Sequence, residues 1–130
     1  MFYLDYDEQL DILYVRFPSY WMDANYEIES KNKNGIKNGH KGVILYRAIE
    51  MNNMTGFAIY SFKSRLETSS VPDFIDELEK EINEAIEENK SEYEEDDVDY
   101  GHQFVGLLFQ LYNTELKKLL YHTDRVRVDG

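Results

Sequence analysis

Residues 70–90 of the chain read SVPDFIDELEKEINEAIEENK. Ser70 stands at the N-cap position of a helix, with Pro72 in the first turn and an acid, Asp73, three residues after the cap. Apolar residues then follow at the three- and four-residue spacing of one helix face. They are Phe74, Ile75, Leu78, Ile82, Ala85 and Ile86. The stretch predicts a long amphipathic helix that separates a β-rich half of the chain from a helical half.

The part of the chain before this helix predicts β-strands. Residues 11–17 read DILYVRF, a β-branched and aromatic run in which Leu13, Val15 and Phe17 share one face. Further strands are expected over residues 2–6, 26–29, 43–49 and 56–62. A turn at residues 52–53 joins the last two strands as a hairpin, and the Gly-, Lys- and Asn-rich residues 31–41 predict a loop.

The part of the chain after the first helix predicts a second one over residues 103–121. The first half of this segment is apolar on nearly all sides, so we expect it to be the buried central element. Its side chains Phe104, Leu108, Phe109 and Leu111 should then be nearly inaccessible to solvent.

Together these elements predict an α+β fold, with an antiparallel β-meander of four to five strands followed by two α-helices. A chain of 130 residues is expected to be a single domain, with its β-rich half over 1–66 and its helical half over 70–122. The second helix should pack on the sheet, and the first should cover an edge with its acids outward. Residues 91–101 are too charged to pack and predict a connection, while residues 125–128 predict either a terminal strand or a tail.

The net charge is confined to one quarter of the chain. Residues 71–102 carry 14 acids and 2 bases, a net of −12 that equals the total for the protein. Residues 1–70 carry 9 acids and 8 bases, and residues 103–130 carry 3 acids and 4 bases, so the flanks cancel at −1 and +1. Such a block is either a solvated face or a surface that attracts something basic. It argues against direct binding to nucleic acid, because phosphates need cationic partners.

Stability does not decide between these two interpretations of the acidic block, residues 73–99. Like-charge pairs at helical spacing outnumber attractive ones in the first helix, at a net penalty on the order of 1 kcal/mol. A helix rises about 1.5 Å per residue and duplex DNA presents one charge per about 1.7 Å, so a flank of carboxylates can imitate a short stretch of DNA. The candidate partner-binding residues are Asp76, Glu77, Glu81, Glu84, Glu87, Glu88, Glu92, Glu94, Glu95, Asp96, Asp97, Asp99 and Trp21. Trp21 is included because interface anchors favour tryptophan, although a loop folded over the sheet edge explains it equally well.

No catalytic or metal-binding pattern is found in the sequence. The chain has no cysteine, and none of its histidines, His40, His102 and His122, lies in a ligand-spaced pair. A calcium loop starting at Asp96 fails, because its third position is Val98 and its twelfth is a leucine in place of the bidentate glutamate. We therefore predict no catalytic residue, no metal and no cofactor.

The segment Tyr6-Asp7-x-x-x-Asp11-x-Leu13-Tyr14-Val15, followed by Gly42-Val43-Ile44-Leu45 and Gly56-Phe57-x-Ile59, resembles a family of very short bacterial domains of unknown function. The signature of that family is Tyr-Asp-x-x-x-Asp-x-Leu-Tyr-Ile/Val and two later strands. The resemblance covers roughly residues 3–62. It implies a small β-meander and an antitoxin-like role, and it carries over no catalytic residue. The chain departs from the family in residues 31–41 and in the whole helical half.

These observations favour a small cytoplasmic protein that inhibits another protein. Its partner would be a basic protein, a nuclease or another nucleic-acid-binding protein, whose surface the acids occlude. A phage anti-CRISPR or anti-defence factor fits this description, and so does an immunity protein or antitoxin against a nuclease. The alternative is an interaction or assembly module whose acids only give solubility, and an enzyme ranks third. The start of the chain lacks a signal-peptide pattern and no apolar run is long enough for a membrane span. The sequence leaves open whether the chain forms a homodimer.

Overall fold

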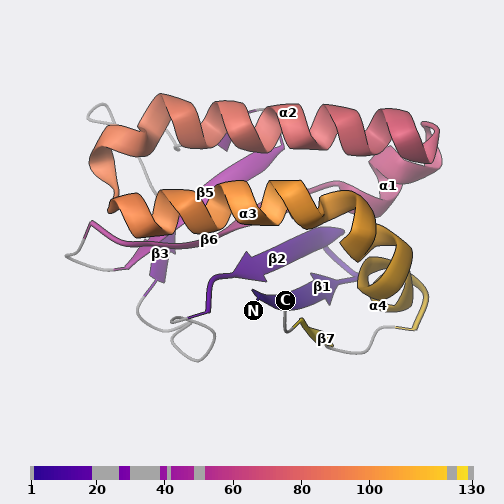
Figure 1. Cartoon of the computed structure of the whole chain (residues 1–130). Coiled ribbons are helices and arrows are strands. Elements are labelled where there is room, and N and C mark those ends of the chain that lie inside the picture. The colour runs from indigo at the N-terminus through magenta and orange to yellow at the C-terminus, as the bar shows by residue number, and fades with distance from the viewer. Residues whose placement is uncertain are drawn as a thin grey trace.

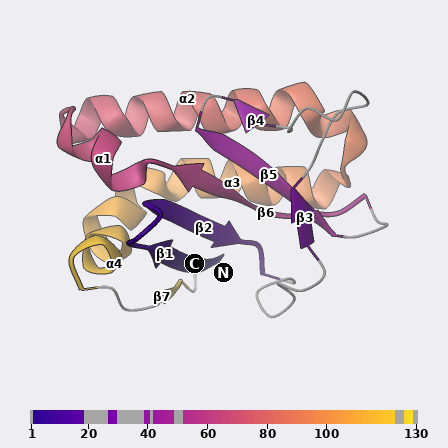
Figure 2. The same cartoon turned by 180° about the vertical axis from the view of Figure 1, so that it is seen from behind.

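A computed structural model describes residues 2–18, 27–29, 39–40, 42–48, 52–122 and 126–128. Strands fill the first half of the chain and long helices the second, and the helices lie over one face of the sheet (Figure 1). Seen from behind, the strands stand in front of the helices (Figure 2). The α+β fold predicted from the sequence is thereby confirmed.

The described residues form a sheet of seven antiparallel strands. Four of them are five to seven residues long, namely β1 (Phe2–Asp7), β2 (Ile12–Arg16), β5 (Val43–Ala48) and β6 (Met54–Tyr60). The other three are two or three residues long, namely β3 (Glu27–Glu29), β4 (Gly39–His40) and β7 (Val126–Val128). β7 pairs with β1, so the last segment of the chain adds a strand rather than a free tail.

The strand order is β3-β5-β6-β2-β1-β7, with β4 also paired to β5. The hairpins β1–β2 and β5–β6 are both present, but β2 pairs with β6 and not with the strand that follows it in the chain. β6 is the most completely buried strand, which explains why it takes a central place with a neighbour on each side. The register sets Leu13 and Val43 on either side of Ile59, so that the core residues of three strands form one row.

The helices are α1 (Phe62–Glu67), α2 (Val71–Asn89), α3 (Glu95–Leu111) and α4 (Lys117–His122). A 3₁₀ turn, Lys90–Glu92, joins α2 to α3, and a π-helical segment, Tyr112–Leu116, joins α3 to α4. α2 begins as the sequence predicts, because the Ser70 hydroxyl accepts a hydrogen bond from the backbone N–H of Asp73 at 3.3 Å. All six apolar residues of its predicted stripe are buried.

The prediction that residues 91–101 form an unpacked connection is wrong. α3 begins at Glu95, eight residues before the predicted start, and Val98 and Gly101 are buried in its first turns. Acidic side chains in a first turn are favoured by the positive end of the helix dipole, so Glu95 and Asp96 support the helix they were expected to prevent. A high density of acids argues against a helix in general, but at an N-terminus it stabilises one.

The core lies between the sheet and the two long helices. Phe104 of α3 packs edge-on against Phe2 and Phe57, with ring centroids 5.4 and 5.2 Å apart. Leu108 and Leu111 are buried as expected, but Phe109 is 55% exposed. The prediction that α3 is buried on nearly all sides is therefore wrong, since only one face of this helix meets the sheet and α2.

Two sequence-based predictions fall outside the described residues. They concern Trp21 as an interface anchor and most of the loop over residues 31–41. Within the residues that the structure describes, no helix combines the length and apolar character that crossing a membrane requires.

Candidate functional site

Two residues of the segment quoted for the resemblance, Tyr6 and Asp11, take part in a helix cap. Asp11 has a left-handed backbone (φ 55°) and points its carboxylate at the N-terminus of α1. Its Oδ1 accepts from the Tyr6 hydroxyl at 2.7 Å and from the Lys63 N–H at 2.8 Å, and its Oδ2 accepts from the Ser64 N–H at 3.0 Å and the Ser64 hydroxyl at 2.7 Å. Because helix N-termini leave N–H groups without partners, this carboxylate completes α1.

The electrostatics of this cap confirm that the carboxylate is held in its charged form. Burial alone would raise the pKa of Asp11, but the hydrogen bonds from Ser64, Tyr6 and Lys63 outweigh burial and lower it. Burial and the hydrogen bond to Asp11 raise the pKa of the Tyr6 phenol. Tyr6 and Asp11 therefore act in folding. This role was not predicted, because no pattern in the sequence indicated α1.

Glu81, a predicted partner-binding residue, belongs to the interior. Its side chain is 3% exposed, and its Oε2 lies 2.7 Å from Nη2 of Arg65, which reaches it from α1. The same Arg65 nitrogen lies 3.4 Å from Oε1 of Glu77, and the guanidinium stands over the ring of Phe74 at 5.7 Å. Buried charges require such pairing, so Glu81 cannot meet a partner protein and its assignment to the exposed flank is wrong.

Asp97 is the second predicted partner-binding residue that is buried. It accepts a hydrogen bond from Nδ2 of Asn53 at 3.1 Å, and the N–H of Glu94 donates to the Asn52 carbonyl at 2.9 Å. These contacts tie the start of α3 to the turn between β5 and β6. Burial raises the pKa of Asp97 and the charges of Glu94 and Asp96 raise it further, although the hydrogen bonds from Asn53 and from the Met54 backbone lower it.

Glu87 is exposed but takes part in a small network. Its carboxylate lies 2.8 Å from Nζ of Lys90 and 3.0 Å from Nε2 of His102, whose Nδ1 is 3.0 Å from Oδ1 of Asn83. The hydrogen bond from Lys90 lowers the pKa of Glu87, burial opposes it slightly, and the charge of Lys90 and the hydrogen bond from His102 add to the lowering. The network links α2 to α3 along their outer edge.

Seven acids gather where α2 ends and α3 begins, and we call them the acidic corner. They are Glu87, Glu88, Glu92, Glu94, Glu95, Asp96 and Asp99, all exposed. Of the remaining predicted residues, Asp76 and Glu77 are exposed on α2 and Glu84 is half-buried, with its Oε1 4.0 Å from Nζ of Lys80. The structure thus brings seven of the twelve predicted acids together at one end of the helical layer.

Phe109 is an exposed aromatic side chain that the sequence assigned to the core. Helical spacing puts it on the same side of α3 as His102, seven residues earlier, and His102 contacts α2. α2 and α3 run side by side in opposite directions (Figure 1). On α2, burial, followed by the charge of Asp76, raises the pKa of Glu79. The helical layer thus exposes one large apolar side chain, Phe109, among its described residues.

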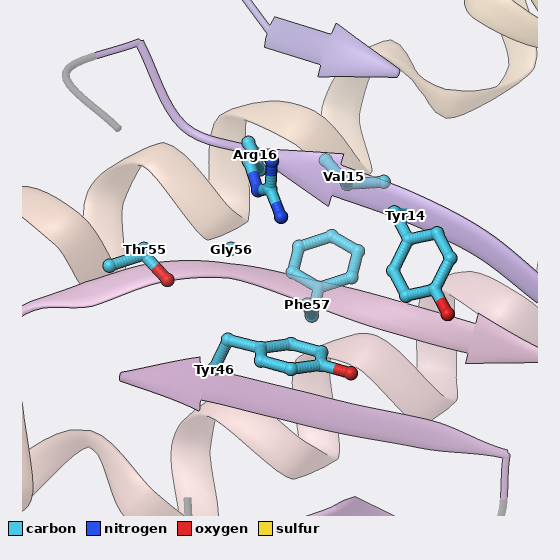
Figure 3. Close-up of a pocket in the computed structure, with 7 residues that line it drawn as sticks. All are labelled: Tyr14, Val15, Arg16, Tyr46, Thr55, Gly56 and Phe57. Carbon is cyan, nitrogen blue, oxygen red and sulfur yellow. The ribbon is translucent and has the colours of Figure 1, made fainter. Parts of the chain in front are cut away.

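The sheet face that the helices leave uncovered carries two adjoining hollows. The larger, of about 300 Å³, has walls formed by Tyr14, Arg16 and Tyr46, and Figure 3 shows these side chains around Gly56. The smaller, of about 140 Å³, is formed by Tyr3 and Asp5 together with Tyr14 and Arg16. Burial raises the pKa of the Tyr14 phenol, and at neutral pH the phenol is protonated and can donate a hydrogen bond, as any tyrosine can.

In the part of the chain that the structure describes, no three His, Cys, Asp or Glu side chains converge, so no set of metal ligands is assembled there. The Asp96–Gly101 stretch, considered above as a calcium loop, is helical and directs its acids to different sides.

Comparisons of the chain with protein-family models, with curated proteins and with solved structures give no match.

Proposed function

We propose that the acidic corner binds a basic surface of another protein and thereby blocks access of nucleic acid to that surface. The observation that carries the proposal is the seven exposed acids within residues 87–99, a stretch in which Lys90 is the single base. A partner that binds nucleic acid presents the complementary charge, because phosphates need cationic contacts.

The two sides of the corner have opposite effects on stability. Acids at the start of α3 are favoured by the helix dipole, but Glu87 and Glu88 lie in the last turn of α2, where the dipole disfavours them and no base stands in that turn. Lys90 and His102 contact Glu87, whereas Glu88 gains nothing from the fold that the structure shows. Because the helix dipole disfavours Glu87 and Glu88 at this position, their presence there supports a role in binding and not in folding.

The biological settings that suit this activity are those inferred from the sequence. A cytoplasmic anti-CRISPR or other phage anti-defence factor would occlude the nucleic-acid groove of a nuclease, and an immunity protein or antitoxin would neutralise a nuclease toxin. Neither role needs a catalytic residue or a cofactor. In both, association would be fast and would slow as salt rises, because steering by exposed charge is screened over about 8 Å at physiological ionic strength.

The test compares baits that differ only in the corner. Wild-type protein and the variant E88Q/E95Q/D96N are used to capture proteins from the host of origin at low and high salt. We expect the wild type to retain basic nucleic-acid-binding proteins that duplex DNA elutes, and we expect the variant to lose them. Association rates with the captured protein should fall in the variant and, for the wild type, with increasing salt.

A matched control removes the same number of charges elsewhere. The variant E8Q/E67Q/E115Q also loses three negative charges, but from the β1–β2 turn, α1 and the end of the helical layer. It should capture the same proteins as the wild type. Equal capture by all three baits would overturn the proposal, because the charge of the corner would then not matter. An equal loss in both variants would overturn it as well, because only the total charge would then matter.

A second candidate function is apolar assembly, favoured by the exposure of Phe109. In that case F109S would abolish capture, E88Q/E95Q/D96N would not, and salt would have little effect, because apolar burial is not screened.

A further inference from the structure

The larger hollow on the uncovered sheet face is shaped by the backbone of β6. Gly56 pairs with Arg16 on one side and with Tyr46 on the other, so two large side chains flank a position that has none. In the next row, the small Ala58 lies between Tyr14 and Ile44. The central strand thus forms the floor of a trough whose walls are aromatic and cationic (Figure 3).

The trough cannot be filled by a simple substitution at its floor. A Cβ on Gly56 would overlap the carbonyl oxygen of Val15, and the φ of this residue, +157°, is one that L side chains rarely adopt. β2 and β6 therefore approach each other at this point only because Gly56 has no side chain. A glycine within a strand often marks a place where another group comes close to the backbone.

A buried hydroxyl without a partner lines the same hollow. Thr55 is 1% exposed, and its Oγ1 has no hydrogen-bond partner. The register moves from Tyr46–Gly56 to Arg47–Met54, which leaves Thr55 as an extra residue opposite β5. Bulges of this kind re-aim side chains and occur next to binding sites. Figure 3 shows the hydroxyl at one end of the hollow, beside Gly56.

We propose that this hollow binds a small planar aromatic anion, with its ring between Tyr14 and Tyr46 and its carboxylate or phosphate on Arg16. Tyrosine rings stack on planar ligands, and a guanidinium pairs with both oxygens of such anions. Thr55 supplies a further hydrogen bond. The Thr55 hydroxyl is closed to solvent, so a side chain that lines the hollow must move before a ligand can reach this hydroxyl. Arg16 is that side chain, because it is long and its guanidinium is attracted to an anion.

The charge of the protein permits an anion at this place. The acidic block lies on α2 and α3, on the opposite side of the sheet, whereas residues 1–70 carry 9 acids and 8 bases (Figures 1 and 2). Charges separated by more than about 8 Å of solvent are largely screened at physiological salt. Asp5 lines the smaller hollow but not the larger one. Its negative charge repels an anion, so the anionic group of the ligand is directed into the larger hollow. The proposal is independent of the acidic corner.

The experiment is a titration of the ¹⁵N-labelled protein, followed by NMR, with four probes: AMP, adenosine, 4-hydroxybenzoate and inorganic phosphate. We expect AMP, 4-hydroxybenzoate or both to shift amides of β2, β5 and β6, and to bind more tightly than adenosine or phosphate. The aromatic anion that binds more tightly shows whether the ligand is a nucleotide, as AMP is, or an aromatic carboxylate, as 4-hydroxybenzoate is. No shift with either of them, or equal binding of phosphate alone, would overturn the proposal.

Three variants locate the site. R16Q should weaken the aromatic anion about tenfold, the loss expected for one charge-assisted hydrogen-bonded contact, and leave adenosine unchanged. R47Q is the matched control, since Arg47 is also half-buried on the sheet but does not line the hollow, and it should bind as the wild type does. T55V keeps the shape and relieves the unpaired hydroxyl, so the fold should persist while affinity falls severalfold. Wild-type affinity in both R16Q and T55V would overturn the proposal.

Discussion

Two positions on α2, one at its middle and one at its C-terminal end, show how the same type of side chain takes different roles on one helix. Glu77, Glu81, Glu84 and Glu88 follow one another along one flank at helical spacing. At the middle of the helix, Arg65 of α1 lies against this flank, so Glu81 is buried and ion-paired. At the C-terminal end no described element covers Glu88, which stands exposed in the acidic corner. A charge pattern therefore identifies a flank, but the neighbouring element decides whether its charges serve folding or remain available for binding.

A large loss of stability is expected from removal of the buried carboxylate. E81A leaves the guanidinium of Arg65 without its closest partner, and we expect the free energy of unfolding to fall by about 3 kcal/mol. That figure is the lower end of the range for breaking a buried pair, because Arg65 is partly exposed. Urea denaturation monitored by circular dichroism measures it. E88A, at the open end of the same flank, should change stability by no more than about 0.5 kcal/mol.

A double variant separates the ion pair from packing. R65L/E81L removes both charges together, and it should recover most of the lost stability, since apolar replacement of a buried pair is often neutral. If E81A and E88A prove equally stable, the contrast between these two positions on α2 does not exist.

A similar contrast between a covered and an open side should hold between adjacent residues of α3. L108A creates a cavity under the sheet and should cost about 2–5 kcal/mol, whereas F109A removes a side chain that is 55% exposed and should cost far less. Thermal unfolding of the two variants under the same conditions is the measurement. Equal losses would mean that Phe109 packs against something in solution, such as a second copy of the chain.

The smallest effects concern two aspartates whose pKa values move in opposite directions. The pKa of Asp11 is lowered, so its contribution to stability is present above the ordinary value of about 3.9 and is lost as pH falls through the folded-state value. D11N should therefore destabilise the protein at pH 7, by about 1–2 kcal/mol, and less at pH 3. The measurement is the free energy of unfolding at both pH values.

Asp97 should behave in the opposite way. Its pKa is raised, so the stability it contributes is complete below the ordinary value and is lost as pH rises through the folded-state value. D97N keeps an oxygen for the hydrogen bond from Asn53, so it should raise the melting temperature at pH 7 and leave it unchanged at pH 3. A lower melting temperature at pH 7 would show that the charged carboxylate stabilises the turn.

Much of the local structure could be predicted from the sequence. The helix from Val71, its cap at Ser70 and its buried stripe follow from periodicity and capping, and the four long strands follow from β-branched runs. The early start of α3 was missed because the acids of residues 91–101 were taken as a sign of a solvated connection. In the first turn of a helix, however, acids are stabilised by the helix dipole. The exposure of Phe109 was missed because an apolar segment was taken to be buried all round.

The candidate sites could be predicted only in part. The acidic block is visible in the charge count. Two of its acids, Glu81 and Asp97, are buried, and only the structure shows the partners that they meet, Arg65 and Asn53. The hollow on the sheet gave no signal in the sequence. Its walls come from β2 and β5, and these strands flank Gly56 only once β6 lies between them.

The sequence by itself determined where the four long strands and α2 form, because capping, turn residues and hydrophobic periodicity act over a few neighbouring positions. It also determined that the negative charge falls on the helical half. The tertiary structure alone decided which carboxylates are buried, that β2 pairs with β6, and that Asp11 caps a helix fifty residues away in the chain. These outcomes depend on contacts between distant segments, and the free energy of such a contact is set by both partners and by the solvent that they exclude.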